Sequence, residues 1–172
     1  MDGSIQVYYG EGRGKTTAAL GLGIRAAGIG KQVIMVQFLK CKHSDTLDFL
    51  KKLEPELQIF RFAKAACAYS DMDEEERQEQ LSNIRMALGY TRKVLDTGQC
   101  DLLILDEIFG LIDYNIITMD DLRELLAARK ESTDLILTGR NLPEEIREIA
   151  DCIYYIHTEK EQAGEILRSG TE

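Results

Sequence analysis

Residues 10 to 17 read Gly-Glu-Gly-Arg-Gly-Lys-Thr-Thr, and they directly follow the apolar run Ile-Gln-Val-Tyr-Tyr at residues 5 to 9. A strand that passes into a glycine-rich loop and then a helix is typical of a phosphate-binding loop. Glycines allow several backbone N–H groups to turn toward one anion at the helix N-terminus. Lys15 adds a positive charge for the phosphates, and Thr16 adds a hydroxyl for the accompanying Mg²⁺. This stretch therefore predicts a nucleotide-binding protein of the P-loop class.

The loop is a variant of the usual pattern. That pattern has a glycine five residues before Gly14, where this chain has Tyr9. The glycines alternate instead. The candidate nucleotide-binding residues of the loop are Gly10, Gly12, Arg13, Gly14, Lys15, Thr16 and Thr17.

Composition limits the class of protein. The 172 residues, 44% apolar and 30% charged, fit one soluble domain over residues 1–172, with no element predicted in the tail at 158–172. A formal charge of −9 argues against a nucleic-acid binder. No apolar run approaches the roughly 18 residues of a membrane span, and no basic leader with a long apolar stretch is present, so we expect a cytoplasmic protein. The four cysteines form no C-x-x-C pair, so reduced, mostly buried thiols are expected.

Apolar strands and helices alternate along the chain. Strands are predicted at 4–9, 32–39, 57–62, 102–105, 135–138 and 152–157. Helices are predicted at 15–27, 46–53, 73–96, 119–129 and 143–150. Because this alternation has no internal repeat and no linker, we expect an α/β P-loop NTPase fold, RecA-like in layout. Its sheet should be doubly wound and mostly parallel, in a single domain.

A second motif, Leu-Leu-Ile-Leu-Asp-Glu at residues 102 to 107, is an apolar strand that ends in two acids. In a P-loop protein such a strand places its carboxylates at the carboxyl edge of the sheet, beside the phosphate loop. Acidic strand ends also occur simply because they are solvated. Since this one follows a P-loop, we favour the metal role, and the candidate Mg²⁺ ligands are Thr16, Asp106 and Glu107.

The stretch from Gly10 to Gly30 resembles the opening of the P-loop type of ATP:corrinoid adenosyltransferases, a family of cobalamin biosynthesis. The resemblance includes the alternating glycines and the non-glycine Tyr9. It spans residues 4 to 156 and continues through Val33–Lys40, Leu105–Glu107, Leu137–Arg140 and Glu148–Asp151. It implies an enzyme that transfers the 5′-adenosyl group of MgATP to Co(I) of a corrinoid and releases triphosphate. Most members of the family are homodimers.

The resemblance also implies roles for individual residues. Because Co(I) is itself the nucleophile and the whole triphosphate departs, catalysis needs charge neutralisation more than a proton acceptor. The residues expected to serve are Gly12, Gly14 and Lys15 for the phosphates, Thr16 and Glu107 for Mg²⁺, and Asp106 in support of the metal shell. Lys15, Thr16 and Glu107 are the expected catalytic residues.

Two arginines have alternative interpretations. Arg25 matches a family arginine expected near the nucleotide, but an arginine on this helix could equally be a surface or interface residue. Arg140 follows a strand at the loop edge, where it could bind the nucleotide or be a solvated loop charge.

One departure from the family pattern concerns the corrinoid. Family members carry an aromatic segment whose rings displace the lower axial ligand of cobalt, and here the corresponding stretch is Ala-Ala-Cys-Ala at residues 65 to 68. The nearest substitute rings are Tyr69, Phe60 and Phe62. Two alternatives therefore stay open, a P-loop phosphotransferase or ATPase, and a divergent protein that only binds ATP or corrinoid. An electron donor such as a flavoprotein is a further candidate partner.

Overall fold

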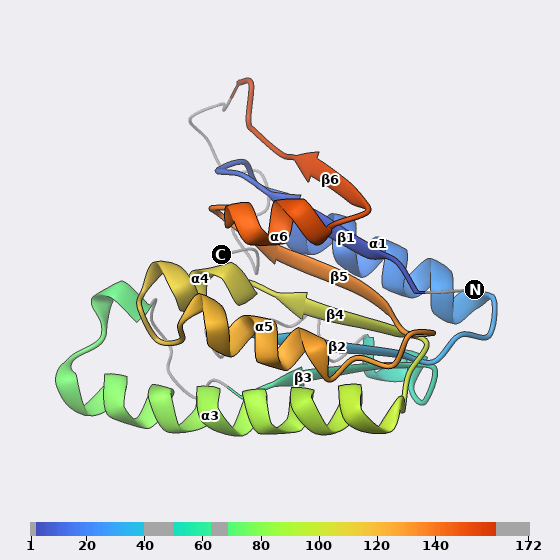
Figure 1. Cartoon of the computed structure of the whole chain (residues 1–172), viewed down its shortest axis with the longest axis horizontal. Helices are drawn as coiled ribbons and strands as arrows, with labels where there is room; N and C mark the ends of the chain where they lie inside the picture. The colour runs from blue at the N-terminus through green and yellow to red at the C-terminus, as the bar shows by residue number, and fades with distance from the viewer. Residues whose placement is uncertain (1–2, 40–49, 63–68, 161–172) are drawn as a thin grey trace.

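Six strands form one parallel sheet in the part of the chain that the structure describes (Figure 1). The structure is a computed structural model, and it describes residues 3–39, 50–62 and 69–160. Across the sheet the strands are ordered β3-β2-β4-β5-β1-β6, and every pairing is parallel. The strands are β1 (Ile5–Tyr9), β2 (Val33–Gln37), β3 (Leu57–Arg61), β4 (Leu102–Asp106), β5 (Asp134–Gly139) and β6 (Cys152–Tyr155).

Helices cover both faces of the sheet, which confirms the predicted doubly wound α/β architecture (Figure 1). Met35 and Val36 are neighbours on β2 and belong to different core clusters, as the alternation of side chains along a strand requires. In the described part of the chain, α1 packs on the Met35 cluster together with Leu53 and Ile156, and the other helices pack on the Val36 cluster. The helices are α1 (Lys15–Gly28), α3 (Glu74–Thr97), α4 (Ile108–Asp113), α5 (Met119–Ala127) and α6 (Glu144–Ile149), with short 3₁₀ turns at Lys51–Leu53 and Tyr69–Asp71.

The strand order brings the two sequence motifs to the same edge of the sheet. All carboxyl ends of a parallel sheet point the same way, so the loop after β1 and the acids at the end of β4 share an edge. β5 lies between β1 and β4 and pairs with both. Any contact from the P-loop to the acids of β4 must therefore pass over the end of β5.

The predicted strands are all present, and most differences lie at element ends. The acidic run at 73–76 begins α3 as expected, with a capping box in which Asp73 and Glu76 each bond the other's backbone N–H. Most of the helix predicted at 46–53 lies outside the described residues, and residues 51–53 form a 3₁₀ turn. Helix α4 was not predicted, because its short sequence Ile-Phe-Gly-Leu-Ile-Asp has no apolar periodicity long enough to indicate a helix.

The amino ends of the strands are joined through Asp134, the first residue of β5. Its carboxylate accepts hydrogen bonds from the backbone N–H of Ser4 at 2.8 Å and from Lys31 Nζ at 2.9 Å. Burial by itself raises the pKa of this carboxyl, but the hydrogen bonds from Ser4 and Lys31 outweigh it. The pKa of Asp134 therefore lies below its ordinary value, and the ionised form is stabilised in the folded protein.

The described cysteines are of two kinds. Cys100 is buried, and burial raises the pKa of its thiol to about 12. Cys152 is exposed, so of the two described cysteines one is buried, where mostly buried thiols were expected. Cys41 and Cys67 lie outside the described residues.

Over the same described ranges, no helix has the length and apolar character needed to cross a membrane.

Candidate active site

The P-loop is held in a shape that requires glycine. Gly14 has a φ of 109° at the N-terminus of α1, in the left-handed region that favours glycine. At Gly12 a Cβ atom would lie 2.6 Å from the backbone of His157, so the loop after β6 leaves no room for a side chain. The N–H groups of Gly10 and Gly12 donate to the carbonyl oxygens of Arg140 and Ile156, both at 3.0 Å. The chain segments after β5 and β6 therefore fix the loop from two sides.

Lys15 is bent back over this loop. Its Nζ donates to the carbonyl oxygen of Gly10 at 2.7 Å and to that of Gly12 at 3.0 Å. An ammonium group held by neutral carbonyls can exchange them for phosphate oxygens at little cost, because its bonds to an anion are stronger. The ammonium group of Lys15 thus lies beside the place that phosphates would occupy.

Asp106 is the centre of the polar part of the site. It is fully buried, and its Oδ1 and Oδ2 lie 3.0 and 3.1 Å from the hydroxyl of Thr16. The hydroxyl of Thr138 donates to Oδ1 at 2.7 Å, and Nε2 of Gln37 donates to Oδ2 at 3.0 Å. Three neutral donors therefore satisfy this buried carboxylate, as burial of a charge requires.

Glu107 follows directly with an unusual backbone conformation. Its φ of 62° lies in the left-handed region, and its backbone N–H donates to the hydroxyl of Thr138 at 2.9 Å. Such a conformation costs a non-glycine residue about 1–2 kcal/mol. The strained turn separates the two acids, because Asp106 is buried in the sheet whereas the next residue, Glu107, lines the cavity.

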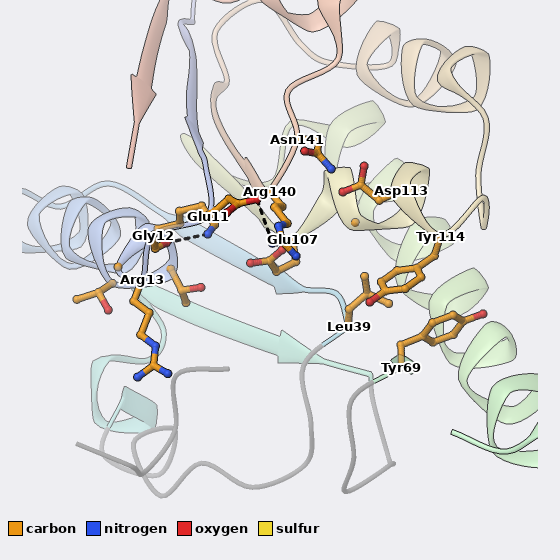
Figure 2. A pocket seen from close by; sticks show the side chains of 15 residues that line it. Glu11, Gly12, Arg13, Leu39, Tyr69, Glu107, Asp113, Tyr114, Arg140 and Asn141 are labelled. Carbon is orange, nitrogen blue, oxygen red and sulfur yellow. Dashed lines mark hydrogen bonds and ion pairs between the residues drawn. The ribbon is translucent and has the colours of Figure 1, made fainter. Parts of the chain in front are cut away.

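These groups meet at a cavity of about 460 Å³ (Figure 2). One wall is the P-loop with Thr16 and Thr17. Across from it lie the apolar and aromatic side chains of Leu39, Tyr69 and Tyr114, and the two rings are in contact with their centroids 5.0 Å apart. The cavity is of the size that small-molecule sites usually have. The remaining lining residues are Glu107, Gly110, Asp113, Arg140 and Asn141.

An ion pair crosses the phosphate side of the cavity. Nη2 of Arg140 lies 3.0 Å from Oε1 of Glu11, and Figure 2 shows the two side chains pointing toward one another. Both are well exposed, with 63% and 73% of their side-chain surface accessible, so the pair contributes little to stability. Its effect is local, because the carboxylate of Glu11 occupies the guanidinium of Arg140, which a bound triphosphate could otherwise contact.

The candidate ligands of a divalent cation in this cavity are oxygen atoms, from the side chains of Thr16 and Glu107. The contact with Asp106 draws the hydroxyl hydrogen of Thr16 to the buried carboxylate, which leaves the oxygen lone pairs of Thr16 for a cation. Glu107 lines the same cavity. Within the described ranges no group of three or more His, Cys, Asp and Glu side chains could hold a metal ion alone. Mg²⁺ is typically held by one or two protein oxygens together with substrate phosphates and water.

Comparison with known proteins now identifies the family. The family model "ATP:corrinoid adenosyltransferase BtuR/CobO/CobP" matches residues 1–172. The chain belongs to this family. The predicted resemblance is therefore confirmed, and the protein is an adenosyltransferase that acts on ATP and a corrinoid. The phosphotransferase alternative is not favoured.

Curated relatives support the same assignment. The corrinoid adenosyltransferase of Escherichia coli K12 is 30% identical over 151 residues, which cover 88% of this chain and 74% of the relative. The corrinoid adenosyltransferase CobA of Salmonella typhimurium is 29% identical with the same coverage. Among solved structures, a KaiC-like protein from Pyrococcus horikoshii superposes with a TM-score of 0.55 at 18% identity, covering 92% of this chain and 74% of the other. That likeness supports the predicted RecA-like P-loop fold.

Most of the predicted site residues of this adenosyltransferase lie together. Those that line the cavity are Gly12, Arg13, Gly14, Lys15, Thr16, Thr17, Glu107 and Arg140, while Gly10 and Asp106 support them from behind. Figure 2 shows the guanidinium of Arg13 directed away from Glu107 and Arg140. Arg25 is exposed in the last turn of α1 and is not among the lining residues, so its role at the nucleotide stays a prediction.

The aromatic residues considered as substitutes for the family's aromatic segment separate into two groups. Phe60 and Phe62 pack against Tyr90, with centroids 4.5 and 6.0 Å from its ring. Tyr69 instead lines the cavity together with Tyr114. The segment 65–68 itself lies outside the described residues.

Sequence reasoning did not single out several residues of the site. Gln37 and Thr138 lie at or near the ends of β2 and β5, and Glu11 lies in the P-loop itself. A usable signal was present for the first two, because polar residues near the carboxyl ends of neighbouring parallel strands converge on one edge. Asp113 and Tyr114 carried no such signal, since helix α4 was not predicted.

Proposed function

We propose that the protein transfers the 5′-adenosyl group of MgATP to Co(I) of a corrinoid in the cavity between the P-loop and the Tyr69–Tyr114 pair. In this step the Co(I) electron pair forms a bond to C5′, the C5′–O bond breaks, and triphosphate leaves. The observation that carries the proposal is the two-sided cavity, which has a phosphate-binding loop on one wall and apolar rings on the other. That pairing of walls suits the reaction, because one substrate carries a polyanion, which departs, and the other is a large macrocycle, which receives the adenosyl group.

The triphosphate would lie along the P-loop. Backbone N–H groups at the start of α1 point toward an anion placed there, and Lys15 would exchange the carbonyl oxygens of Gly10 and Gly12 for phosphate oxygens. Arg140 would likewise exchange Glu11 for a phosphate. Both cations then stabilise the charge that the triphosphate carries as it departs, which is where electrostatic catalysis acts.

Thr16 and Glu107 would hold Mg²⁺, which supplies further neutralisation of the triphosphate charge. Asp106 would act from behind, because it is fully buried and bonds the hydroxyl of Thr16 rather than facing the cavity. This division of roles agrees with the expectation that Asp106 supports the metal shell. It predicts that removing the Glu107 charge affects metal binding more directly than it affects the binding of metal-free ATP.

The corrinoid would lie against Leu39, Tyr69 and Tyr114. These side chains are partly exposed at the cavity, so they offer an apolar surface for the flat face of a macrocycle. Finer features of the proposal are a homodimer, a cytoplasmic location and a flavoprotein as the source of the electron that reduces cobalt.

Product analysis with a chemically reduced corrinoid tests the reaction. Incubation of the protein with MgATP and Co(I) cobalamin should yield an adenosylated corrinoid and triphosphate in equal amounts. Formation of ADP would indicate a phosphotransferase instead, and no product with Co(I) already supplied would indicate a protein that only binds its ligands. Lys15→Ala should lower turnover a hundredfold or more, since it removes several kcal/mol of charge stabilisation from the departing triphosphate.

A second experiment tests how the protein treats the lower ligand of cobalt. If residues 65–68 replace the aromatic segment without compensation, cob(II)alamin bound with MgATP should keep its lower ligand. Base-free cob(II)inamide should then be the better substrate, because no ligand has to be displaced. The electron paramagnetic resonance spectrum distinguishes the two states of cobalt. A four-coordinate spectrum from cob(II)alamin would contradict this expectation, and its loss in Tyr69→Ala would identify the ring responsible.

A further inference from the structure

A row of polar side chains runs across three neighbouring strands at the carboxyl edge of the sheet. Gln37 is the last residue of β2, and its register partners are Arg61, the last residue of β3, and Asp106, the last residue of β4. Residues in register on adjacent strands project to the same face, so these three side chains lie side by side. The row begins at an outer strand of the sheet and ends at the buried carboxylate of the site.

The contacts along this row are short and run in one direction. Arg61 donates from Nη2 at 2.7 Å and from Nε at 3.2 Å to Oε1 of Gln37. Gln37 in turn donates from Nε2 to Oδ2 of Asp106 at 3.0 Å. Gln37 and Asp106 have 5% and 0% of their surface exposed. The amide therefore joins a partly buried cation to a carboxylate, and both the amide and the carboxylate are buried.

Arg61 holds the amide of Gln37 from the side away from Asp106. A guanidinium can only donate hydrogen bonds, so Oε1 of Gln37 must face Arg61, and the NH₂ group must then face Asp106. Asp106 favours the same orientation, because a carboxylate accepts hydrogen bonds, but without Arg61 the amide would lose the contact that fixes its position. Two successive hydrogen bonds thus link the guanidinium of Arg61 on β3 to the carboxylate of Asp106 on β4. They hold the NH₂ group of Gln37 toward that carboxylate.

We propose that Gln37 and Arg61 are positioning residues for the Mg²⁺ site, acting through Asp106 on Thr16. Asp106 lies within hydrogen-bond distance of the Thr16 hydroxyl through both oxygens, at 3.0 and 3.1 Å, so the plane of its carboxylate must be held for both contacts to persist. Gln37 holds Oδ2 from the side opposite the Thr138 contact to Oδ1. The fixed carboxylate keeps the Thr16 hydroxyl hydrogen turned away from the cavity, and the oxygen lone pairs of Thr16 remain available to the cation.

This inference rests on the Mg²⁺ role of Thr16 and Glu107 proposed above, and it adds two residues that lie outside the cavity wall. It predicts a specific pattern. Gln37→Leu should raise the Mg²⁺ concentration needed for half-maximal MgATP binding about tenfold, the effect of losing one hydrogen bond to a charged group. The affinity for ATP without metal should stay within twofold of wild type, because the P-loop contacts are untouched.

The experiment is a calorimetric titration of the full-length protein with ATP at a series of MgCl₂ concentrations, without corrinoid. Gln58→Leu is the matched control, because Gln58 is a partly buried glutamine on β3 with no place in the row. Arg61→Met should shift the Mg²⁺ dependence in the same direction as Gln37→Leu, and Arg61→Lys should restore part of it, since an ammonium group can still donate to Oε1. If Gln37→Leu does not fold, as judged by circular dichroism, the two Arg61 variants decide the question.

Thr16→Ala separates failure of this inference from failure of the metal site. An unchanged Mg²⁺ dependence in the Gln37 and Arg61 variants, with a clear shift in Thr16→Ala, would overturn the positioning role and leave the metal site standing. An unchanged dependence in all of them would overturn the metal site as well. Equal losses of affinity with and without Mg²⁺ in Gln37→Leu would show a merely structural role and also overturn the inference. Because no corrinoid is present, the titration stays readable even if the adenosyl transfer reaction itself fails.

Discussion

Thr138→Val removes one hydroxyl on which both acids of the site depend. The Thr138 hydroxyl is fully buried, donates to Asp106 at 2.7 Å and accepts from the backbone N–H of Glu107 at 2.9 Å. A hydrogen bond to a charged group contributes about 1.5–3 kcal/mol, and an unpaired buried N–H costs about 1–3 kcal/mol. Placing a methyl group where the hydroxyl was offsets about 1 kcal/mol of this loss. We therefore expect the free energy of unfolding to fall by about 2–4 kcal/mol.

Urea unfolding and thermal melting of the variant measure this loss. For a domain of this size it corresponds to a decrease in Tm of about 10 °C. Thr133→Val is the matched control, because Thr133 is also a buried threonine but its hydroxyl makes only a 3.4 Å contact with the carbonyl oxygen of Cys100. The control should lose less than about 1 kcal/mol. Equal losses in the two variants would refute the reasoning, since the proximity of the acids would then be irrelevant.

Three further predictions follow from contacts described above. Glu11→Gln should raise the affinity for MgATP about threefold at low salt and less at high salt, because Arg140 no longer exchanges a carboxylate for phosphate; a weaker affinity in a binding titration would contradict this. Iodoacetamide at pH 8 should alkylate Cys152 but spare Cys100 until urea unfolds the protein, as read by peptide mass mapping. Asp134→Asn should destabilise the protein at pH 7. The lowered pKa of Asp134 gives stability that is present above the ordinary value of about 3.9 and lost as pH falls through the folded value, so the unfolding curves of variant and wild type should converge near pH 2.

Most of the fold could be predicted from local sequence patterns in this chain. The strand at 4–9, the glycine loop and the helix after it form one continuous unit, and the apolar run at 102–105 is typical of a strand covered on both faces. Each of these features is encoded within about a dozen residues, which is the range over which propensity and periodicity act. The pairing of β5 between β1 and β4 is not encoded in this way, because strand order depends on contacts between distant segments.

The site was predicted less completely than the fold, for the same reason. Lys15, Thr16 and Glu107 belong to recognisable motifs, and the structure brings them to one cavity. Gln37 lies at a strand end, which is a usable signal, but its importance and that of Arg61 appear only when the register of three strands places Gln37 between Arg61 and Asp106. Tyr69 was considered as one of three rings, but choosing it over the others required knowing which rings pack into the core.

At residue 107 the side chain that the site uses is not the one that would make the fold most stable. With a φ of 62°, this position would be occupied at lower free energy by glycine or asparagine, which tolerate that conformation. A screen of random variants for heat resistance alone should therefore enrich such substitutions at residue 107 while discarding the carboxylate that lines the cavity. Thermal stabilisation of this enzyme by directed evolution should accordingly be coupled to a selection for adenosyl transfer, or the carboxylate at residue 107 will be lost.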